Sequence, residues 1–372
     1  MNKIGHLANE KNLVYEALAE HLNRLPQSAP INETLMEVLH RLYTETEAQV
    51  ASRFPLVPMT LDKIAGVMGM PENEMATILE EMSAKGLVTA IPRKEAVYYS
   101  LAPVLVGFFE TTFMRTGDQA SIRELAELFE QYFQDAEVKE AVLGSDTKTM
   151  RTMVYESIVP LAVETEVLSY ERVSEIIKQS GGGAISMCPC RHKASHLGKA
   201  CDAPLEVCTS LGTMAKWLVS KGLAKPASVE ELLHILDQTQ KLGLVHLCDN
   251  VMNKPAGICH CCGCCCTLIG NKDSKGAPYV HPSNFIPVVD VKNCLNCSIC
   301  ADRCQVKAIK IRDIGGGFAA AVVDENICIG CGVCVEFCPV EAIHMERRAT
   351  RIVPPENHRD FLKRFADQKN RM

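Results

Sequence analysis

The spacing of apolar positions predicts that the first part of the chain is mainly helical. Between residues 31 and 50, apolar side chains recur every three or four positions, which is the period of an amphipathic helix. Thr60 is a candidate N-cap for a second helix, and a third is expected to begin at Pro71 and end at Gly86. Residues 87–103 then favour two short strands around a tight turn.

The same period continues in the middle of the chain. An amphipathic helix is expected over 122–142, and another over 171–180 that ends at a run of three glycines and leads into a strand. Ser228 and Glu231 have the spacing of a capping box, which predicts a helix that ends near Gly243.

The C-terminal part contains an internal repeat. Residues 288–309 and 322–343 share a Val-Val-Asp opening, four cysteines and a closing Ala-Ile. Residues 270–287, which are rich in Gly, Pro, Ser and Asn, are expected to be a linker in front of this repeat.

Each repeat carries the cysteine spacing C-x2-C-x2-C-x3-C. The eight cysteines are Cys294, Cys297, Cys300, Cys304, Cys328, Cys331, Cys334 and Cys338. Over about 288–346 the double motif resembles bacterial-type ferredoxins with two 4Fe–4S clusters, which implies a βαβ-repeat domain with crosswise ligation. The implied ligand sets are Cys294, Cys297, Cys300 and Cys338 for one cluster, and Cys328, Cys331, Cys334 and Cys304 for the other. A pair of zinc sites is the alternative.

Gln305 departs from the pattern of that family. The family usually has a proline after the fourth cysteine, as Pro339 follows the second motif here. Because proline shapes the turn at the fourth ligand, we expect the potential or exposure of the cluster served by Cys304 to differ.

Eleven further cysteines lie in the middle of the chain. Their arrangement resembles a group of multi-cluster ferredoxin-like proteins of anaerobic microbes, over about 185–345. So many spare thiols would be an oxidation hazard, and at least one further iron–sulfur cluster is therefore expected, supplied jointly by the segments 188–208 and 259–266. The candidate ligands are Cys188, Cys190, Cys201, Cys208, Cys259, Cys261, Cys262, Cys264, Cys265 and Cys266. A zinc site or structural thiols are the alternatives.

Histidines and cations lie among these thiols. His192, His196, His246 and His260 are expected to be surface groups, or groups that position the ligands, rather than ligands. Arg191, His192 and Lys193 are either exposed charges that form a docking face or hydrogen-bond donors to cluster sulfurs.

The order of three helices and a hairpin in residues 1–110 resembles a winged helix-turn-helix. A DNA-binding surface needs Lys and Arg for the phosphates. The segment instead holds nine Lys/Arg and fourteen Asp/Glu, and its expected recognition helix carries Glu72, Glu74, Glu80 and Glu81. A protein-docking role is therefore favoured over nucleic-acid binding.

Composition narrows the class of protein. The chain has 372 residues and a net charge of −6, and no apolar run approaches the length of a membrane span. All nineteen cysteines lie after residue 187 and no signal-peptide pattern begins the chain, which favours a cytoplasmic protein whose thiols bind metal. No glycine run has the spacing of a phosphate loop, so no flavin or nucleotide site is expected.

These observations predict an α+β protein in four parts. The parts are a winged-helix-like docking domain at 1–116, a helical and cysteine-rich middle domain at 117–272, a ferredoxin domain at 273–346 and a basic tail at 347–372. The expected function is single-electron transfer between redox partner proteins, as a carrier or a subunit of an anaerobic oxidoreductase system. A redox-sensing transcriptional regulator and a catalytic reductase subunit are the alternatives.

Overall fold

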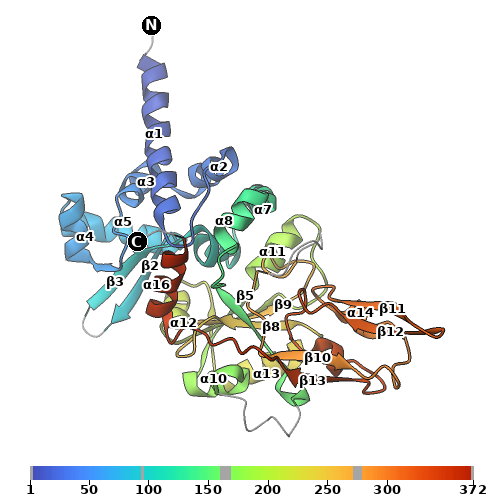
Figure 1. Cartoon of the computed structure of the whole chain (residues 1–372). Coiled ribbons are helices and arrows are strands. Elements are labelled where there is room, and N and C mark those ends of the chain that lie inside the picture. The colour runs from blue at the N-terminus through green and yellow to red at the C-terminus, as the bar shows by residue number, and fades with distance from the viewer. Residues whose placement is uncertain (1–2, 94–95, 160–168, 271–278, 370–372) are drawn as a thin grey trace.

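The structure is a computed structural model that describes residues 3–93, 96–159, 169–270 and 279–369, with side chains from Asn12 onward. Helices and strands are mixed, as the α+β expectation requires. Figure 1 shows the N-terminal helices at one end, the C-terminal strands at the other, and a sheet between them. Within the described ranges, no helix is both long enough and apolar enough to cross a membrane.

Three helices begin the chain: α1 (Lys3–Arg24), α2 (Glu33–Leu42) and α3 (Glu45–Ser52). The expectation of one helix over 31–50 is therefore wrong, because Tyr43 and Thr44 take extended conformations between α2 and α3. Thr44 begins α3 with a capping box in which its hydroxyl and the Glu47 carboxylate each accept a backbone N–H. Such a cap contributes about 1 kcal/mol.

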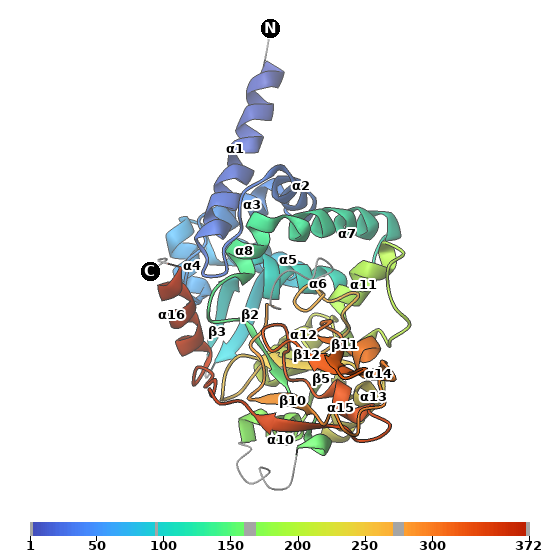
Figure 2. The same cartoon turned by 45° about the vertical axis from the view of Figure 1, so that its right-hand side comes forward.

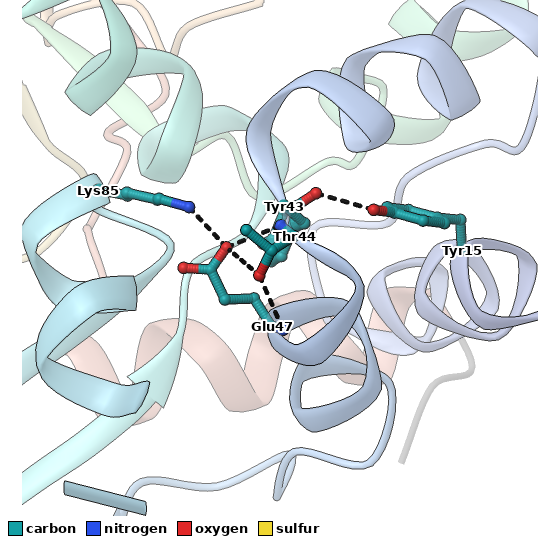
Figure 3. A network of polar contacts seen from close by, with 5 residues as sticks. All are labelled: Tyr15, Tyr43, Thr44, Glu47 and Lys85. Atoms are coloured by element: carbon teal, nitrogen blue, oxygen red, sulfur yellow. Dashed lines mark hydrogen bonds and ion pairs between the residues drawn. The ribbon is translucent and has the colours of Figure 1, made fainter. Parts of the chain in front are cut away.

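Glu47 also ties α3 to the next helices. Figure 3 shows the Lys85 ammonium reaching its carboxylate, and the two groups lie 2.7 Å apart. In the same view the Tyr15 hydroxyl of α1 donates to the carbonyl of Tyr43 at 2.9 Å. The break between α2 and α3 is thus held by contacts from two other helices.

A three-stranded antiparallel sheet with the order β1-β3-β2 follows. Its elements are β1 (Met59–Thr60), α4 (Leu61–Met68), α5 (Glu72–Lys85), β2 (Val88–Arg93) and β3 (Ala96–Leu101). As expected, Pro71 precedes α5 and Gly86 ends it in the left-handed conformation. Thr60 occupies the N-cap position of α4, but its side chain makes no capping hydrogen bond.

Aromatic side chains pack among the following helices, and Phe108 meets Tyr43 at the end of α2 edge to face. These helices are η1 (Val104–Phe108), α6 (Phe109–Phe113), α7 (Gln119–Gln134) and α8 (Ala136–Leu143). The helix expected over 122–142 is broken at Asp135, whose carboxylate caps α8. Phe109, Phe129 and Phe133 pack edge to face or stacked. One apolar core runs from Tyr15 to Leu143 and so spans the expected boundary at residue 116.

The middle of the chain forms a six-stranded antiparallel sheet with the order β4-β8-β9-β6-β5-β7. Its strands are β4 (Met150–Met153), β5 (Gly183–Met187), β6 (Glu206–Leu211), β7 (Lys225–Ala227), β8 (Val245–Asp249) and β9 (Gly257–Cys261). The accompanying helices are η2 (Glu156–Ile158), η3 (Ser169–Glu171), α10 (Val173–Ser180), α11 (Pro189–His196), α12 (Gly212–Ser220) and α13 (Val229–Lys241). The expected capping box of Ser228 and Glu231 is present at α13.

The repeat folds as two similar units, each a strand, a short helix and a strand. The first is β10 (Phe285–Val289), α14 (Ile299–Arg303) and β11 (Ile309–Gly315), and the second is β12 (Phe318–Val323), α15 (Val333–Glu336) and β13 (Ile343–Arg347). The units interlock, because β10 pairs with β13 and β11 with β12. The linker expected over 270–287 is wrong at its end, since β10 already begins at Phe285; residues 271–278 lie outside the described residues.

The basic tail returns to the other end of the molecule. Figures 1 and 2 both show α16 (His358–Gln368) beside β2 and β3 rather than beside the C-terminal strands. The side-chain oxygen of Gln368 accepts from Ser145 and from the backbone of Thr147, both at 2.8 Å. Phe361 and Phe365 pack on Val251 of the middle domain. The Lys369 ammonium donates to the carbonyl of Gln27 at 3.4 Å, so the tail fastens the N-terminal and middle parts together.

Candidate metal centres

Four cysteines of the middle domain meet at one point, which we call site A. Cys201, Cys262, Cys264 and Cys265 have sulfur atoms that all lie within 4.8 Å of one another. The Sγ atoms of Cys201 and Cys262 are 3.5 Å apart, and those of Cys264 and Cys265 are 3.6 Å apart. Four converging thiols are a donor set that fits a cubane iron–sulfur cluster or a zinc ion.

Arg191 lies against site A. Its side chain is only 2 % exposed, and its Nη2 donates to the sulfur of Cys262 at 3.5 Å and to the carbonyl of His260 at 3.3 Å. A hydrogen bond with Cys265 and then the Arg191 charge lower the pKa of Cys262 to about 4. Cys262 therefore favours the thiolate, the form that binds metal, whereas burial raises the pKa of Cys264 to about 11 and the hydrogen bond with Cys262 raises the pKa of Cys265.

The buried cations correct the expectation of an exposed docking face. Arg191, His192 and Lys193 are all buried, and the Lys193 ammonium pairs with Glu130 of α7 at 2.5 Å. These contacts join α11 to the N-terminal helices. Arg191 is therefore not an exposed charge, and its Nη2 donates to the Cys262 sulfur; donation to a cluster sulfur stays a prediction.

Of the two roles expected for the histidines, the surface one does not hold for three of the four, and the positioning role remains a prediction. His192, His246 and His260 are buried and hydrogen-bonded within the protein. The Thr239 hydroxyl lies 3.2 Å from His246 Nε2 and 2.8 Å from His260 Nδ1, so α13 fixes both rings. His196 is part-buried, with its Nε2 3.0 Å from that of His192.

Six other cysteines of the middle domain do not reach site A. They line a separate cavity of about 340 Å³, and are Cys188, Cys190, Cys208, Cys259, Cys261 and Cys266. The block 259–266 is thus divided between two places. Cys248 belongs to neither: it is fully buried beside Ile258, and burial raises its pKa to about 12.

The cysteines of the repeat gather around the short helices α14 and α15. Cys304, Cys328, Cys331 and Cys334 line one small pocket together, although Cys304 comes from the other motif. The backbone N–H of Ala308 donates to the Cys304 sulfur at 3.2 Å. Cys294, Cys300 and Cys338 pack in the same apolar cluster, and Cys297 is exposed. All-thiolate donors with N–H groups aimed at sulfur fit iron–sulfur clusters.

Gln305 joins the repeat to the cysteine block. Its side-chain oxygen accepts from the backbone N–H of Gly263 at 2.8 Å, and its amide nitrogen donates to the carbonyl of Gly243 at 2.9 Å. A Cβ at Gly263 would overlap the Gln305 carbonyl, so only glycine allows this close approach. Sequence reasoning noticed the missing proline but had no signal for this contact.

A second contact joins the two parts at the other motif. The backbone N–H of Tyr155, just after β4, donates to the carbonyl of Cys331 at 3.2 Å. A Cβ at Gly332 would overlap the side chain of Ile158. The segment after Cys304 and the loop at Cys331 line the same pocket, and both are therefore packed against the middle domain.

The comparisons with known proteins find one family. Residues 321–344 match the model of the 4Fe-4S binding domain. The match contains the second motif, Cys328 to Cys338, and begins after the first motif, which ends at Cys304. Comparisons with curated proteins and with solved structures give no match. With the thiols of site A, the matched domain gives the chain a capacity for iron–sulfur electron transfer.

Proposed function

We propose that this protein moves single electrons between redox partner proteins through iron–sulfur clusters in its C-terminal repeat and its middle domain. Two 4Fe–4S clusters would occupy the repeat with crosswise ligation, and a further cluster would occupy site A. Thiolate ligation and buried surroundings hold such centres and tune their potentials without any organic cofactor.

The observation that carries this proposal is the bridge made by Gln305. Gly263 lies between two thiols of site A, Cys262 and Cys264, and its N–H is bonded to the side chain that follows Cys304. A short path of covalent bonds and one hydrogen bond therefore runs from site A to a ligand of the repeat. Side-by-side centres linked in this way are what an electron relay needs.

The ends of the relay differ in exposure. Cys297 is exposed and Leu295 beside it is 65 % exposed, so the cluster of Cys294, Cys297 and Cys300 would lie at the surface, where a partner protein can exchange electrons. The pocket with Cys304 and Cys331 faces the middle domain instead. The proposed order of electron transfer therefore begins at the exposed cluster of Cys294, Cys297 and Cys300. It continues through the cluster in the pocket of Cys304 and Cys331 and ends at site A.

The N-terminal part fits a protein-docking role better than DNA reading. In α5, the helix expected to enter DNA, Ser83 accepts a hydrogen bond from Trp217 of α12 at 3.1 Å. Glu80 of the same helix pairs with Lys221 at 2.6 Å. With this end of α5 held by the middle domain, its exposed positions are mainly acidic, and duplex DNA would be repelled. A winged-helix-like docking module remains our proposal for this part.

The test is metal analysis and EPR spectroscopy of the full chain purified without oxygen. We expect iron and sulfide in equal amounts, at about twelve of each or more per chain, and one-electron uptake by each cluster. Zinc in place of iron, or clusters that take up no electrons from dithionite, would refute the proposal.

A further inference from the structure

The cavity lined by six cysteines lies between the N-terminal helices and the central sheet. Its thiols come from separate elements: Cys188 and Cys190 flank the start of α11, Cys208 lies on β6, Cys259 and Cys261 on β9, and Cys266 in the loop beyond. Its volume of about 340 Å³ falls in the range of ligand sites, roughly 300–1,000 Å³. We call it site B.

The thiols of site B lie near one another around the cavity. The sulfur of Cys266 lies 3.4 Å from that of Cys261. The pKa of Cys190 is raised by its neighbour Cys266, and the pKa values of Cys208 and Cys261 are raised by their neighbour Cys259. Together with Cys188, these six thiols line one space.

Site B is distinct from site A. Side chains two positions apart in a strand point to the same face, so Cys259 and Cys261 of β9 share one face and Cys262 leaves on the other. None of the four cysteines of site A lines the described cavity. A single cluster therefore does not draw on both sets.

We propose that site B holds a second thiolate-ligated iron–sulfur centre of the middle domain. This inference deepens the proposed function and rests on it. Cysteines that serve only as small apolar side chains pack closely, and protein interiors hold few voids larger than a water molecule. Here six thiols surround a space instead, and soft sulfur donors select iron–sulfur clusters among the metals and cofactors of proteins.

The other walls of site B support a role at the far end of the relay. Glu110 of α6, Met114 just after that helix, and Trp217 of α12 also line the cavity. A centre here would lie directly beneath the N-terminal helices, which are the part proposed to dock a partner. Its surroundings are mostly apolar, which excludes water and tunes a cluster potential.

The experiment compares two double variants of the full chain, reconstituted without oxygen and assayed for iron, sulfide and EPR signals. Cys208→Ser with Cys261→Ser removes thiols of site B only, and Cys201→Ser with Cys264→Ser those of site A only. We expect about sixteen irons per wild-type chain, four fewer in each variant, and loss of a different EPR signal in each. Cys248→Ser, a buried cysteine of the same sheet outside both sites, is the matched control and should lose none.

The outcomes separate the two proposals. Wild-type protein with about twelve irons, a site B variant with undiminished iron, or loss of one and the same signal in both variants would overturn site B while leaving the relay intact. Absence of the repeat's own cluster signals from the wild type would overturn the proposed function itself. If the EPR signals of the repeat clusters persist in a variant, that variant has folded. The iron content of the wild-type chain tests the occupancy of site B without any variant.

Discussion

At the scale of single residues, charge and hydrogen bonding at the thiols decide what a bound cluster can do. Arg191 is buried and carries its positive charge to within 3.5 Å of the Cys262 sulfur. A reduced cluster is more negative than an oxidised one, so a nearby cation and N–H donor favour reduction. Arg191 is therefore expected to raise the midpoint potential of the site A cluster.

The first prediction concerns Arg191→Met, which keeps most of the side-chain volume and removes the charge. The midpoint potential of the site A cluster should fall by roughly 60–130 mV, because a charged hydrogen bond contributes about 1.5–3 kcal/mol and about 1.4 kcal/mol corresponds to 59 mV for one electron. A redox titration followed by EPR measures it. Lys225→Met, at a cation whose side chain is 75 % exposed, is the control and should leave the potential unchanged. An unshifted potential in Arg191→Met would contradict this role.

His281 makes stability depend on pH. Burial, with a smaller contribution from the Lys148 charge, lowers the pKa of His281 from 6.5 to about 4, although Asp146 acts in the opposite direction. Its Nε2 accepts from the backbone N–H of Lys148 at 3.3 Å. The folded state therefore favours the neutral ring, and the stability that this ring contributes is complete above the unfolded pKa of 6.5 and is lost as the pH falls toward 4.

The second prediction is that His281→Gln is less sensitive to acid than the wild type. Between pH 7 and pH 5 the wild type should lose about 2 kcal/mol more unfolding free energy than the variant, because protons bind the unfolded histidine first. Urea unfolding at the two pH values measures the difference. Equal losses in the two proteins would show that His281 does not titrate in this way.

At the scale of elements, the repeat predicts how the cysteines are shared. Cys304 follows α14 but lines a pocket with Cys328, Cys331 and Cys334. The interlocked strand pairs bring the two units together and so place the fourth cysteine of one motif near the other motif's loop. The same pairing should carry Cys338 to the loop of Cys294.

The third prediction follows from this exchange. Cys338→Ser should alter the EPR signal and potential of the cluster held by Cys294, Cys297 and Cys300, and leave the cluster held by its own motif unchanged. Cys304→Ser is the matched variant and should do the reverse. Damage confined to the cluster of the mutated cysteine's own motif would rule out crosswise ligation.

Local sequence signals predicted where helices occur better than where one helix is interrupted and the next begins. The capping box at Ser228 and the left-handed glycine at Gly86 fix helix ends through contacts within a few residues, and both are confirmed. The breaks at Thr44 and Asp135 were missed because an apolar period continues through them, and only the capping carboxylate and hydroxyl interrupt it. The burial of Arg191 depends on Pro204 and His260, which only the folded chain brings to it.

The sequence predicted which cysteines are candidate ligands, but not which of them belong to site A and which to site B. Spacing identified the candidate ligands, yet the division of the block 259–266 depends on where β9 ends and which face each side chain takes. The strand alternation of Cys259 and Cys261 was the available signal. The hydrogen bond between Gln305 and Gly263 joins residues 42 positions apart, and no local sequence signal predicts it.

At the scale of the whole molecule, the parts are held so that the proposed centres form one line. Gln305 and Tyr155 fasten the repeat to the middle domain. His192 of α11 and Lys369 just after α16 contact the carbonyls of Phe113 and Gln27 and so fasten the middle domain to the N-terminal part. The fastening at Gln305 matters most for the relay, because it lies between Cys304 and site A.

The fourth prediction is that Gln305→Leu weakens this junction. Loss of two part-buried hydrogen bonds should cost about 1–3 kcal/mol of unfolding free energy and slow electron transfer between site A and the repeat. Gln305→Glu keeps the oxygen that accepts from Gly263 and loses the donor to Gly243, so its effect on transfer should be smaller. Stability is measured by urea unfolding, and transfer by freeze-quench EPR. Wild-type rates in Gln305→Leu would exclude this path.

The central claim is that the middle domain and the repeat share electrons through iron–sulfur clusters. The most direct measurement is an EPR-monitored redox titration of the full chain, compared with the Cys201→Ser, Cys264→Ser double variant. We predict that the site A cluster takes up an electron and that its signal is split by magnetic coupling to the reduced repeat clusters. The double variant should lose both the signal and the splitting. A titration in which only the repeat clusters are reduced, with the same spectrum in both proteins, would contradict the claim.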